Sequence, residues 1–288
     1  MFNEDYYNNF CEANHISQQI LNDVLVEVFP KAYCFCYNID NHVKKEDILV
    51  TAGFGMNNCP HIMTALQMFN IVQMQDCGFK TQIVLGDFDV MLARNSDNSK
   101  RIVDKYYSFL TNLGYHNTIR NQFDSLEESR NAIWLSSFIE ESDLLYTQED
   151  LLKHYDKNFV MDYKTKLSIM LMVSDLISPL LQKKAKCIIS VSGLDESKYC
   201  ILAEHERAKM SLFGTISGVF SKLLTGINGH PKMSKSKPES GVFLNESINS
   251  MLQKIHDNES LNNGLIEWVP KNMRVEDVMV KLHDSWNN

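Results

Sequence analysis

Short apolar runs alternate with stretches of helical period along most of the chain. Residues 48–52, 81–85 and 186–191 are mostly apolar, and each run is followed within two residues by glycine, as in buried strands that enter tight turns. Apolar residues recur at helical spacing over 16–29, from His61 to about Gly78, from Asn98 or Ser99 to Gly114, and over 125–145, 160–182 and 195–210. The pattern predicts an α/β fold, with a Rossmann-like parallel sheet and helices on both faces.

The chain divides into three expected parts. The composition changes near Gly226, where a loop rich in glycine, proline, lysine and serine precedes another helical pattern. We expect a helical N-terminal extension over 1–45, a Rossmann-like domain over 46–225, and a loop followed by a small C-terminal helical region over 226–288.

Composition and charge are those of an ordinary globular protein. The 288 residues are 44% hydrophobic and carry a formal charge of -8, which argues against a DNA-binding surface but allows a local basic patch. Seven cysteines without a C-x-x-C pair or clustered histidines predict free thiols and no metal site. The N-terminus lacks the pattern of a secretory signal, and no apolar run approaches the roughly 20 residues that cross a bilayer. We therefore expect a soluble, cytoplasmic protein without membrane contacts.

Three polar segments follow predicted strands, at 53–64, 85–89 and 192–196. In open parallel sheets, ligands bind beyond the carboxyl ends of the strands, so the three segments together indicate a binding site. Taken singly, each has a simpler explanation, because glycine after a strand is ordinary in turns and aspartate there commonly caps a helix.

A basic loop, GHPKMSKSKPES, lies at 229–240 in this otherwise acidic chain. Its lysines are Lys232, Lys235 and Lys237. Ammonium groups on long stems suit a polyphosphate whose charge moves during a reaction. From charge alone, a solvated basic loop is the better explanation.

The exact order of residues in this loop favours a functional role over a solvated basic loop. Residues 232–236 read KMSKS, the signature of class I aminoacyl-tRNA synthetases, and the flanking segments 223–229 and 237–244 are also similar to that family. The segment HIMT at 61–64 stands where the family has HIGH, and SGLDE at 192–196 resembles its Gly-x-Asp-Gln segment. Over about 45–250 the chain resembles the tryptophanyl and tyrosyl branch, a resemblance that makes 46–225 the catalytic domain.

The resemblance implies an enzyme in which the carboxylate of an amino acid attacks the α-phosphate of ATP, with Mg²⁺ on the departing pyrophosphate. It assigns catalytic roles to His61, Thr64, Lys232 and Lys235. It assigns ATP contacts to His61, Thr64 and Lys235 and also to Gly53, Gly55, Met233 and Ser234. The amino acid would be bound by Asp87, Gln182, Gly193, Asp195 and Glu196, with Tyr163 and Asp175 as further candidates for the pocket. Members of this branch are usually homodimers, which we expect here as well.

Several positions depart from the family pattern. Met63 replaces the glycine against which adenine lies, whereas Thr64 keeps a hydrogen-bond donor in place of the second histidine. Glu196 replaces glutamine and puts a negative charge near the substrate, where it would suit a cationic group such as the α-ammonium or a substrate other than tryptophan or tyrosine. Cys59, close to His61, is a weak candidate for a nucleophile.

The residues after Lys237 are too few for the helical anticodon-binding domain that such synthetases normally carry. Two hypotheses remain open. The first is a shortened activating enzyme that transfers the amino acid to tRNA or to another acceptor. The second is a non-catalytic paralogue that binds an amino acid or aminoacyl-tRNA.

Overall fold

A computed structural model describes residues 4–18, 29–40, 42–56, 58–94, 98–140, 142–144, 162–230, 232–235 and 237–288. Within them, one sheet has the strand order β1-β2-β7-β6-β3-β4-β5. The expected parallel arrangement holds for five strands, β3 (Ile48–Gly55), β4 (Lys80–Gly86), β5 (Thr118–Asn121), β6 (Cys187–Gly193) and β7 (Thr215–Ser221). The strands β1 (Ser17–Gln18) and β2 (Tyr33–Tyr37), at the β7 end of the sheet, are antiparallel to their neighbours.

The order of the parallel strands reverses beside β3. From β3 the chain runs outward through β4 and β5, whereas β6 pairs with the other side of β3 and leads to β7. A reversal of this kind opens a crevice at the carboxyl ends of the strands, which is where ligands bind in open α/β sheets. The fold therefore directs attention to the ends of β3 and β6.

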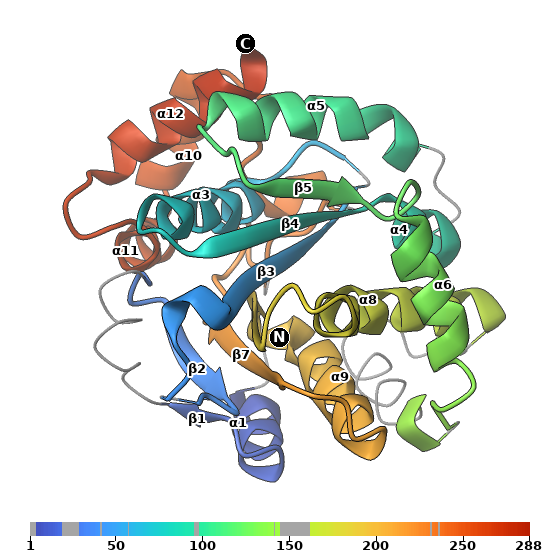
Figure 1. The fold of residues 1–288 in the computed structure, drawn as a ribbon. Helices are drawn as coiled ribbons and strands as arrows, with labels where there is room; N and C mark the ends of the chain where they lie inside the picture. Colours follow the sequence, from blue (N-terminus) through green and yellow to red (C-terminus); the bar gives the residue numbers. More distant parts are fainter. Residues whose placement is uncertain are drawn as a thin grey trace.

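Helices cover both faces of the sheet, as predicted (Figure 1). Successive residues of a strand point to opposite faces, and on β3 Val50 and Ala52 belong to one hydrophobic core while Leu49 belongs to the other. The first core includes residues of α3 (Ile62–Asp76) and α5 (Asn98–Asn112), and the second includes residues of α8 (Tyr163–Leu181) and α9 (Ser197–Lys209). These four helices confirm the predictions for 61–78, 98–114, 160–182 and 195–210. Two short helices, α4 (Asp87–Arg94) and α6 (Leu126–Leu135), pack against α8.

Some predicted elements differ from the structure. The helix expected over 16–29 is wrong at its start, because Ser17–Gln18 forms β1, and residues 19–28 lie outside the described residues. The helix expected over 125–145 ends as α6 at Leu135, where Ser136 is the C-cap. Residues 1–45 contain α1 (Glu4–Ala13) but also β1 and β2, and β2 pairs with β7. The N-terminal part thus contributes to the central sheet and is not only a helical extension.

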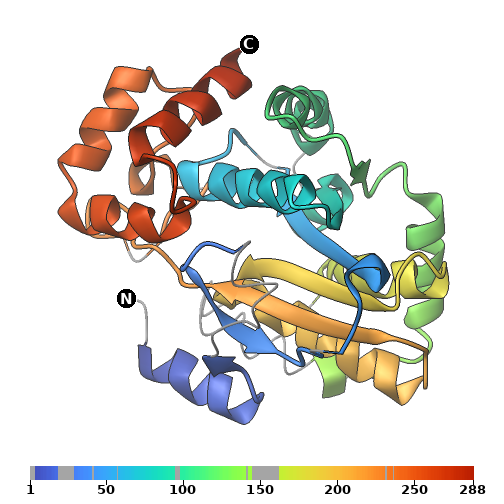
Figure 2. The ribbon, with the colours of Figure 1, turned by 60° about the vertical axis from the view of Figure 1, so that its left-hand side comes forward.

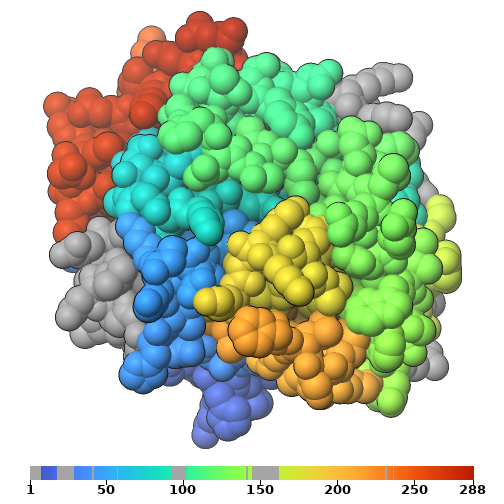
Figure 3. Space-filling view, in the orientation of Figure 1, coloured from blue at the N-terminus to red at the C-terminus, as the bar shows by residue number. Residues whose placement is uncertain are grey.

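The C-terminal helical region is present as α10 (Ile248–His256), α11 (Glu259–Trp268) and α12 (Val275–Asn287). These helices gather on the α3 side of the sheet (Figure 2), and α12 packs against α3 and α5 (Figure 3). The Trp286 ring contacts the rings of Tyr106 and Phe109 edge to face, with centroids 5.2 and 5.6 Å apart. Because one hydrophobic core includes residues of β3 and of these helices, the packing is continuous across Gly226.

Two further features concern the cysteines and the possible membrane-spanning helices. All seven cysteines are free thiols, as the sequence predicts. Within the described ranges, no helix combines the length and the apolar character needed to span a membrane.

Candidate active site

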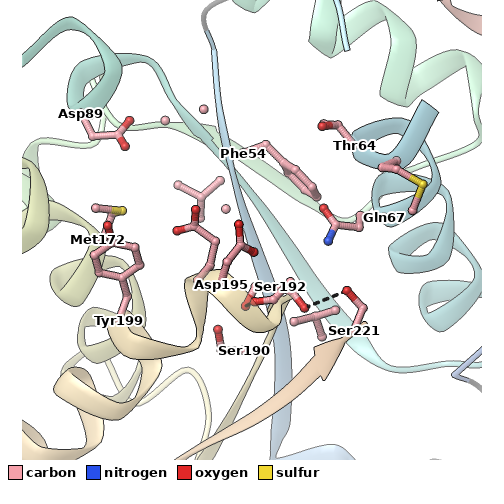
Figure 4. A pocket seen from close by; sticks show the side chains of 18 of the residues that line it. Phe54, Thr64, Gln67, Asp89, Met172, Ser190, Ser192, Asp195, Tyr199 and Ser221 are labelled. Atoms are coloured by element: carbon pink, nitrogen blue, oxygen red, sulfur yellow. Dashed lines mark hydrogen bonds between the residues drawn. The ribbon is translucent and has the colours of Figure 1, made fainter. Parts of the chain in front are cut away.

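A cavity of about 510 Å³ opens at the carboxyl ends of four parallel strands (Figure 4). Its floor includes Gly53 to Gly55 from β3, Gly86 from β4, Ser192 and Gly193 from β6, and Ser221 from β7. The Ser221 hydroxyl donates a hydrogen bond to the Ser192 carbonyl at 3.4 Å and links two of these strand ends. The position agrees with the crevice expected from the strand order.

The first turn of α3 forms one side of the cavity. His61 is the N-cap of this helix, and its Nδ1 accepts a hydrogen bond from the Thr64 amide at 3.3 Å, while Nε2 lies 3.4 Å from the Thr64 hydroxyl. Burial and the nearby charges of Lys235 and Lys232 lower the pKa of His61 to about 3. A neutral imidazole thus stands at a helix N-terminus, where the backbone dipole favours anions.

Two lysines of the basic loop reach the same side. The Lys235 ammonium donates to the Gly55 carbonyl at the end of β3 at 2.6 Å, and the Asn58 amide group donates to the Lys235 carbonyl at 3.2 Å. The Lys232 ammonium pairs with Asp195 at 2.6 Å. Both lysines line the cavity, whereas Lys237 is exposed and does not. The loop therefore adds two positive charges to the helix N-terminus.

Contacts of Met233 with the hydrophobic core and of Ser234 with Ser240 hold the loop in place. Met233 is buried in the hydrophobic core, and the Ser234 amide donates to the Ser240 hydroxyl at 2.9 Å. A Cβ added at Gly226 would lie 2.6 Å from the Ser240 carbonyl and 2.8 Å from the Lys232 carbonyl, so a side chain there would displace the loop. Met233 and Ser240 thus anchor the loop, while Lys237 stays exposed.

Asp195 follows the end of β6 and connects that strand to the loop. Burial would raise its pKa, but the charge and the hydrogen bond of Lys232, with a contribution from Lys198, hold the pKa of Asp195 below its ordinary value. Its Oδ1 would lie 2.6 Å from a Cβ at Gly193, so a side chain at that strand end would displace the Asp195 carboxylate. The neighbouring Glu196 also lines the cavity.

The opposite side of the cavity is built mainly from one face of α8. The lining residues of this helix follow helical spacing and are Thr165, Ser168, Ile169, Met172, Asp175 and Leu176. The Asp175 carboxylate accepts hydrogen bonds from Arg120 and from Gln122, both at 2.7 Å. Figure 4 shows Asp89, Met172 and Tyr199 on this side, facing Phe54, Thr64 and Gln67 across the cavity. The α8 end of the cavity is lined by apolar and acidic side chains, whereas the α3 end is lined by the ammonium groups of the loop.

The structure brings together most residues that the sequence singles out. The cavity is lined by Gly53, Gly55, His61, Met63, Thr64, Asp175, Gly193, Asp195, Glu196, Lys232, Met233, Ser234 and Lys235. Met63, which replaces the family's glycine, is buried in this wall. The cavity thus combines the segments at 53–64, 192–196 and 229–240, as the sequence suggests.

Four other candidates do not line the cavity. The Asp87 carboxylate is buried and accepts hydrogen bonds from the Phe123 amide and the Asn121 side chain, both at 3.0 Å, so it organises the end of β5 and does not line the cavity. Gln182 caps the far end of α8 and donates to Glu128 at 3.1 Å. The side chain of Tyr163 is exposed. Burial raises the pKa of Cys59 to about 11, which leaves it a protonated thiol and a poor nucleophile at neutral pH.

The comparison with protein families agrees with this geometry. Residues 44–288 match the model of the class I tRNA synthetases (W and Y). The chain belongs to this family. Members of the W and Y family are ligases that use ATP.

Solved structures show the same fold. A tryptophanyl-tRNA synthetase from Aeropyrum pernix superposes with a TM-score of 0.74 at 14% identity, over 99% of this chain and 92% of that one. A tryptophanyl-tRNA synthetase from Encephalitozoon cuniculi bound to tryptophan has a TM-score of 0.74 at 14% identity, over 98% and 94% of the two chains. A tyrosyl-tRNA synthetase from Archaeoglobus fulgidus in complex with L-tyrosine has a TM-score of 0.66 at 11% identity, over 94% and 92%. No curated protein sequence gives a match.

Sequence reasoning missed several lining residues. Asp89 belongs to the strand-end segment 85–89, but that segment directed attention to Asp87, which lies two residues earlier. Ser168 and Met172 lie one helical turn apart on α8, where helical period alone could have grouped them with Asp175. Gln122 and Tyr199 have no local sequence signal, because the contacts that place them come from distant parts of the chain.

Proposed function

We propose that this protein activates an amino acid by forming an aminoacyl adenylate. A carboxylate oxygen of the amino acid forms a bond to the α-phosphorus of ATP. The bond between that phosphorus and the oxygen bridging to the β-phosphate breaks, and pyrophosphate leaves with the electron pair. Chemistry of this kind depends on positioning and on the neutralisation of charge rather than on covalent participation of the protein.

The observation that carries the proposal is the meeting of Lys232 and Lys235 with the N-terminus of α3 on one cavity wall. In the proposed reaction, the two ammonium groups neutralise the charge that collects on the leaving pyrophosphate. Neutral His61 and the Thr64 hydroxyl bind phosphate oxygens as hydrogen-bond donors, and Gly53 and Gly55 let the nucleotide approach the backbone. Each well-placed donor in such a site contributes about 3 kcal/mol to the transition state.

Mg²⁺ is proposed as the metal ion of the reaction. In such sites it is bound mainly by substrate phosphates, with one or two protein carboxylates and water. Asp195, whose carboxylate contacts Lys232, and its neighbour Glu196 are carboxylates that line the cavity, so the donor set fits this pattern. When bound, the ion supplies further neutralisation of the pyrophosphate charge.

The amino acid is proposed to bind between β6 and α8. Asp89, Asp175 and Glu196 make this end of the cavity acidic, and Met172 and Tyr199 give it apolar surface. An acidic lining suits the α-ammonium group, which every amino acid substrate carries. Two of the solved relatives hold tryptophan or L-tyrosine, and the negative charge of Glu196 extends the range of candidates to substrates with a cationic group.

The test is the exchange of labelled pyrophosphate into ATP, screened over the twenty standard amino acids and a set of nonstandard ones. We expect exchange with one amino acid, and a loss of at least about a hundredfold in Lys235→Ala. Lys237→Ala is the matched control, because Lys237 belongs to the same loop but is exposed and does not line the cavity. Absence of exchange with every amino acid, or an equal loss in both variants, would count against activation.

A non-catalytic paralogue is the second candidate, and the burial of Met63 in the cavity wall favours it. It predicts that calorimetry detects binding of an amino acid but not of ATP. Whether tRNA or another molecule accepts the activated group is tested by repeating the assay with tRNA and following the transfer. The cytoplasmic location stays a prediction.

We also propose that the protein forms a homodimer. The support from the structure is an apolar surface on and beside α6, where Leu126, Ile133, Trp134 and Phe138 are exposed among the described residues. A second copy that covered these side chains would remove apolar area from water. Light scattering during size-exclusion chromatography should give twice the chain mass, and Ile133→Glu should shift it to one chain mass.

A further inference from the structure

A buried carboxylate lies near the C-terminal end of α9, away from the cavity. Glu206 has no exposed surface, and neither of its oxygens has a hydrogen-bond partner in the part of the chain that the structure describes. A buried carboxylate without partners is unfavourable unless it is protonated or bound to a cation. Glu206 has no role in the proposed reaction, since Tyr199 at the cavity precedes it by about two helical turns, which is roughly 10 Å along α9.

Two other potential metal ligands face Glu206. The ligand atoms of Asp143, His205 and Glu206 all lie within 4.8 Å of one another. The Asp143 Oδ1 atom is 3.6 Å from His205 Nε2. The Asp143 Oδ2 atom accepts hydrogen bonds from the Glu140 amide at 2.8 Å and from the Lys209 ammonium at 3.3 Å. These bonds fix the carboxylate so that Oδ1 points toward His205, as supporting contacts do around metal ligands.

Among the described residues, the charges around this point do not balance. Glu140, Asp143 and Glu206 contribute three carboxylates, while Lys209, which contacts Glu140 at 3.4 Å and Asp143, contributes one ammonium group. A divalent cation between the three ligands would supply two further positive charges.

We propose that Asp143, His205 and Glu206 bind a divalent first-row metal ion that links α9 to the segment after α6. One imidazole nitrogen and two carboxylate oxygens suit Mn²⁺ and, more strongly, Zn²⁺, whereas Mg²⁺ disfavours the imidazole. His205 is exposed, so the ion has access from solvent and room for water ligands. The ion would fix the C-terminal half of α9, whose N-terminal half carries Tyr199 to the active site.

The probe is Mn²⁺, because it binds thiols weakly and the chain has seven free cysteines. Free Mn²⁺ is measured by electron paramagnetic resonance while the metal-free protein is titrated without nucleotide. We expect one bound equivalent, and release of Mn²⁺ by lower concentrations of Zn²⁺.

Three variants distinguish this site from surface binding. Glu206→Gln keeps the shape of the side chain and should weaken Mn²⁺ binding by more than about tenfold, as should His205→Asn. His256→Asn removes an exposed histidine from α10 and should leave binding unchanged. Circular dichroism verifies that each variant is folded. Absence of binding by the wild-type chain, or unchanged binding by both Glu206→Gln and His205→Asn, would overturn the proposal.

Discussion

Replacement of His61 by asparagine should change how the stability of the protein depends on pH. His61 is partly buried at the N-cap of α3, and its pKa is lowered from 6.5 to about 3. Between these values the unfolded chain binds a proton that the folded chain does not. Stability from this group is therefore complete above about pH 6.5 and is lost as the pH falls toward 3.

The size of the effect follows from the two pKa values. At pH 5 the unfolded histidine lies 1.5 pH units below its pKa, and at about 1.4 kcal/mol per unit the wild-type protein should lose about 2 kcal/mol relative to pH 7.5. Asparagine is a favoured N-cap residue and can accept the Thr64 amide hydrogen bond in place of the imidazole. The loss of ring packing against Phe243 affects both pH values equally and cancels in the difference.

The assay is urea unfolding followed by circular dichroism at pH 7.5 and pH 5 for the wild type, His61→Asn and, as a control, His256→Asn, which changes an exposed histidine of α10. We expect the pH-dependent loss to be about 2 kcal/mol smaller in His61→Asn and unchanged in the control. An equal loss in all three proteins would show that His61 titrates normally in the folded state, and would remove the reason for treating it as a neutral donor.

Three further outcomes are expected. Lys232→Ala should lower the free energy of unfolding by about 1–2 kcal/mol because buried Asp195 loses its ammonium partner, whereas Lys237→Ala should stay within about 0.5 kcal/mol in the same urea titration. Trp286→Ala should cost about 3–5 kcal/mol, and fluorescence and circular dichroism should still give one coincident transition if the C-terminal helices share the main core. Met63→Ala should tighten ATP binding in calorimetry by opening the cavity wall, and an unchanged affinity would place the nucleotide away from this side chain.

Part of the fold could be predicted because the local signals were strong. β3 and β6 are buried on both faces and appear as continuous apolar runs. The end of α3 was marked by Gly78, whose φ of 82° suits the residue after a helix. By contrast β7, TISGVFS, contains two serines and a glycine, and its place in the sheet depends on pairing with β6 and β2. The strand conformation of β7 was therefore determined by tertiary pairing and could not be predicted from local propensity.

The candidate site, like the fold, could be predicted from the sequence only in part. Lysines, glycines and a helix N-terminus close to strand ends could be found from sequence, because short motifs carry their own chemistry. Asp87 could not be separated from Asp89 in this way, since the choice depends on hydrogen bonds that reach Asp87 from Asn121 and Phe123. Gln182 lies two helical turns beyond Asp175, roughly 10 Å further along α8, which a loose alignment did not resolve.

Backbone hydrogen bonds join the start of α3 to the segment that follows the basic loop. The Ile62 amide donates to the Val242 carbonyl at 2.9 Å, the Leu244 amide donates to the Pro60 carbonyl at 3.2 Å, and His61 and Phe243 form an isolated bridge. The lysine contact to Gly55 joins residues 180 positions apart. At synthesis rates of about 5–20 residues per second, the two halves of the proposed phosphate-binding wall emerge from the ribosome on the order of 10–40 s apart. A nascent chain that stops before residue 242 can pair its first strands, but it cannot complete the proposed nucleotide site. ATP binding, if the proposal holds, would therefore report only on chains that extend past residue 242.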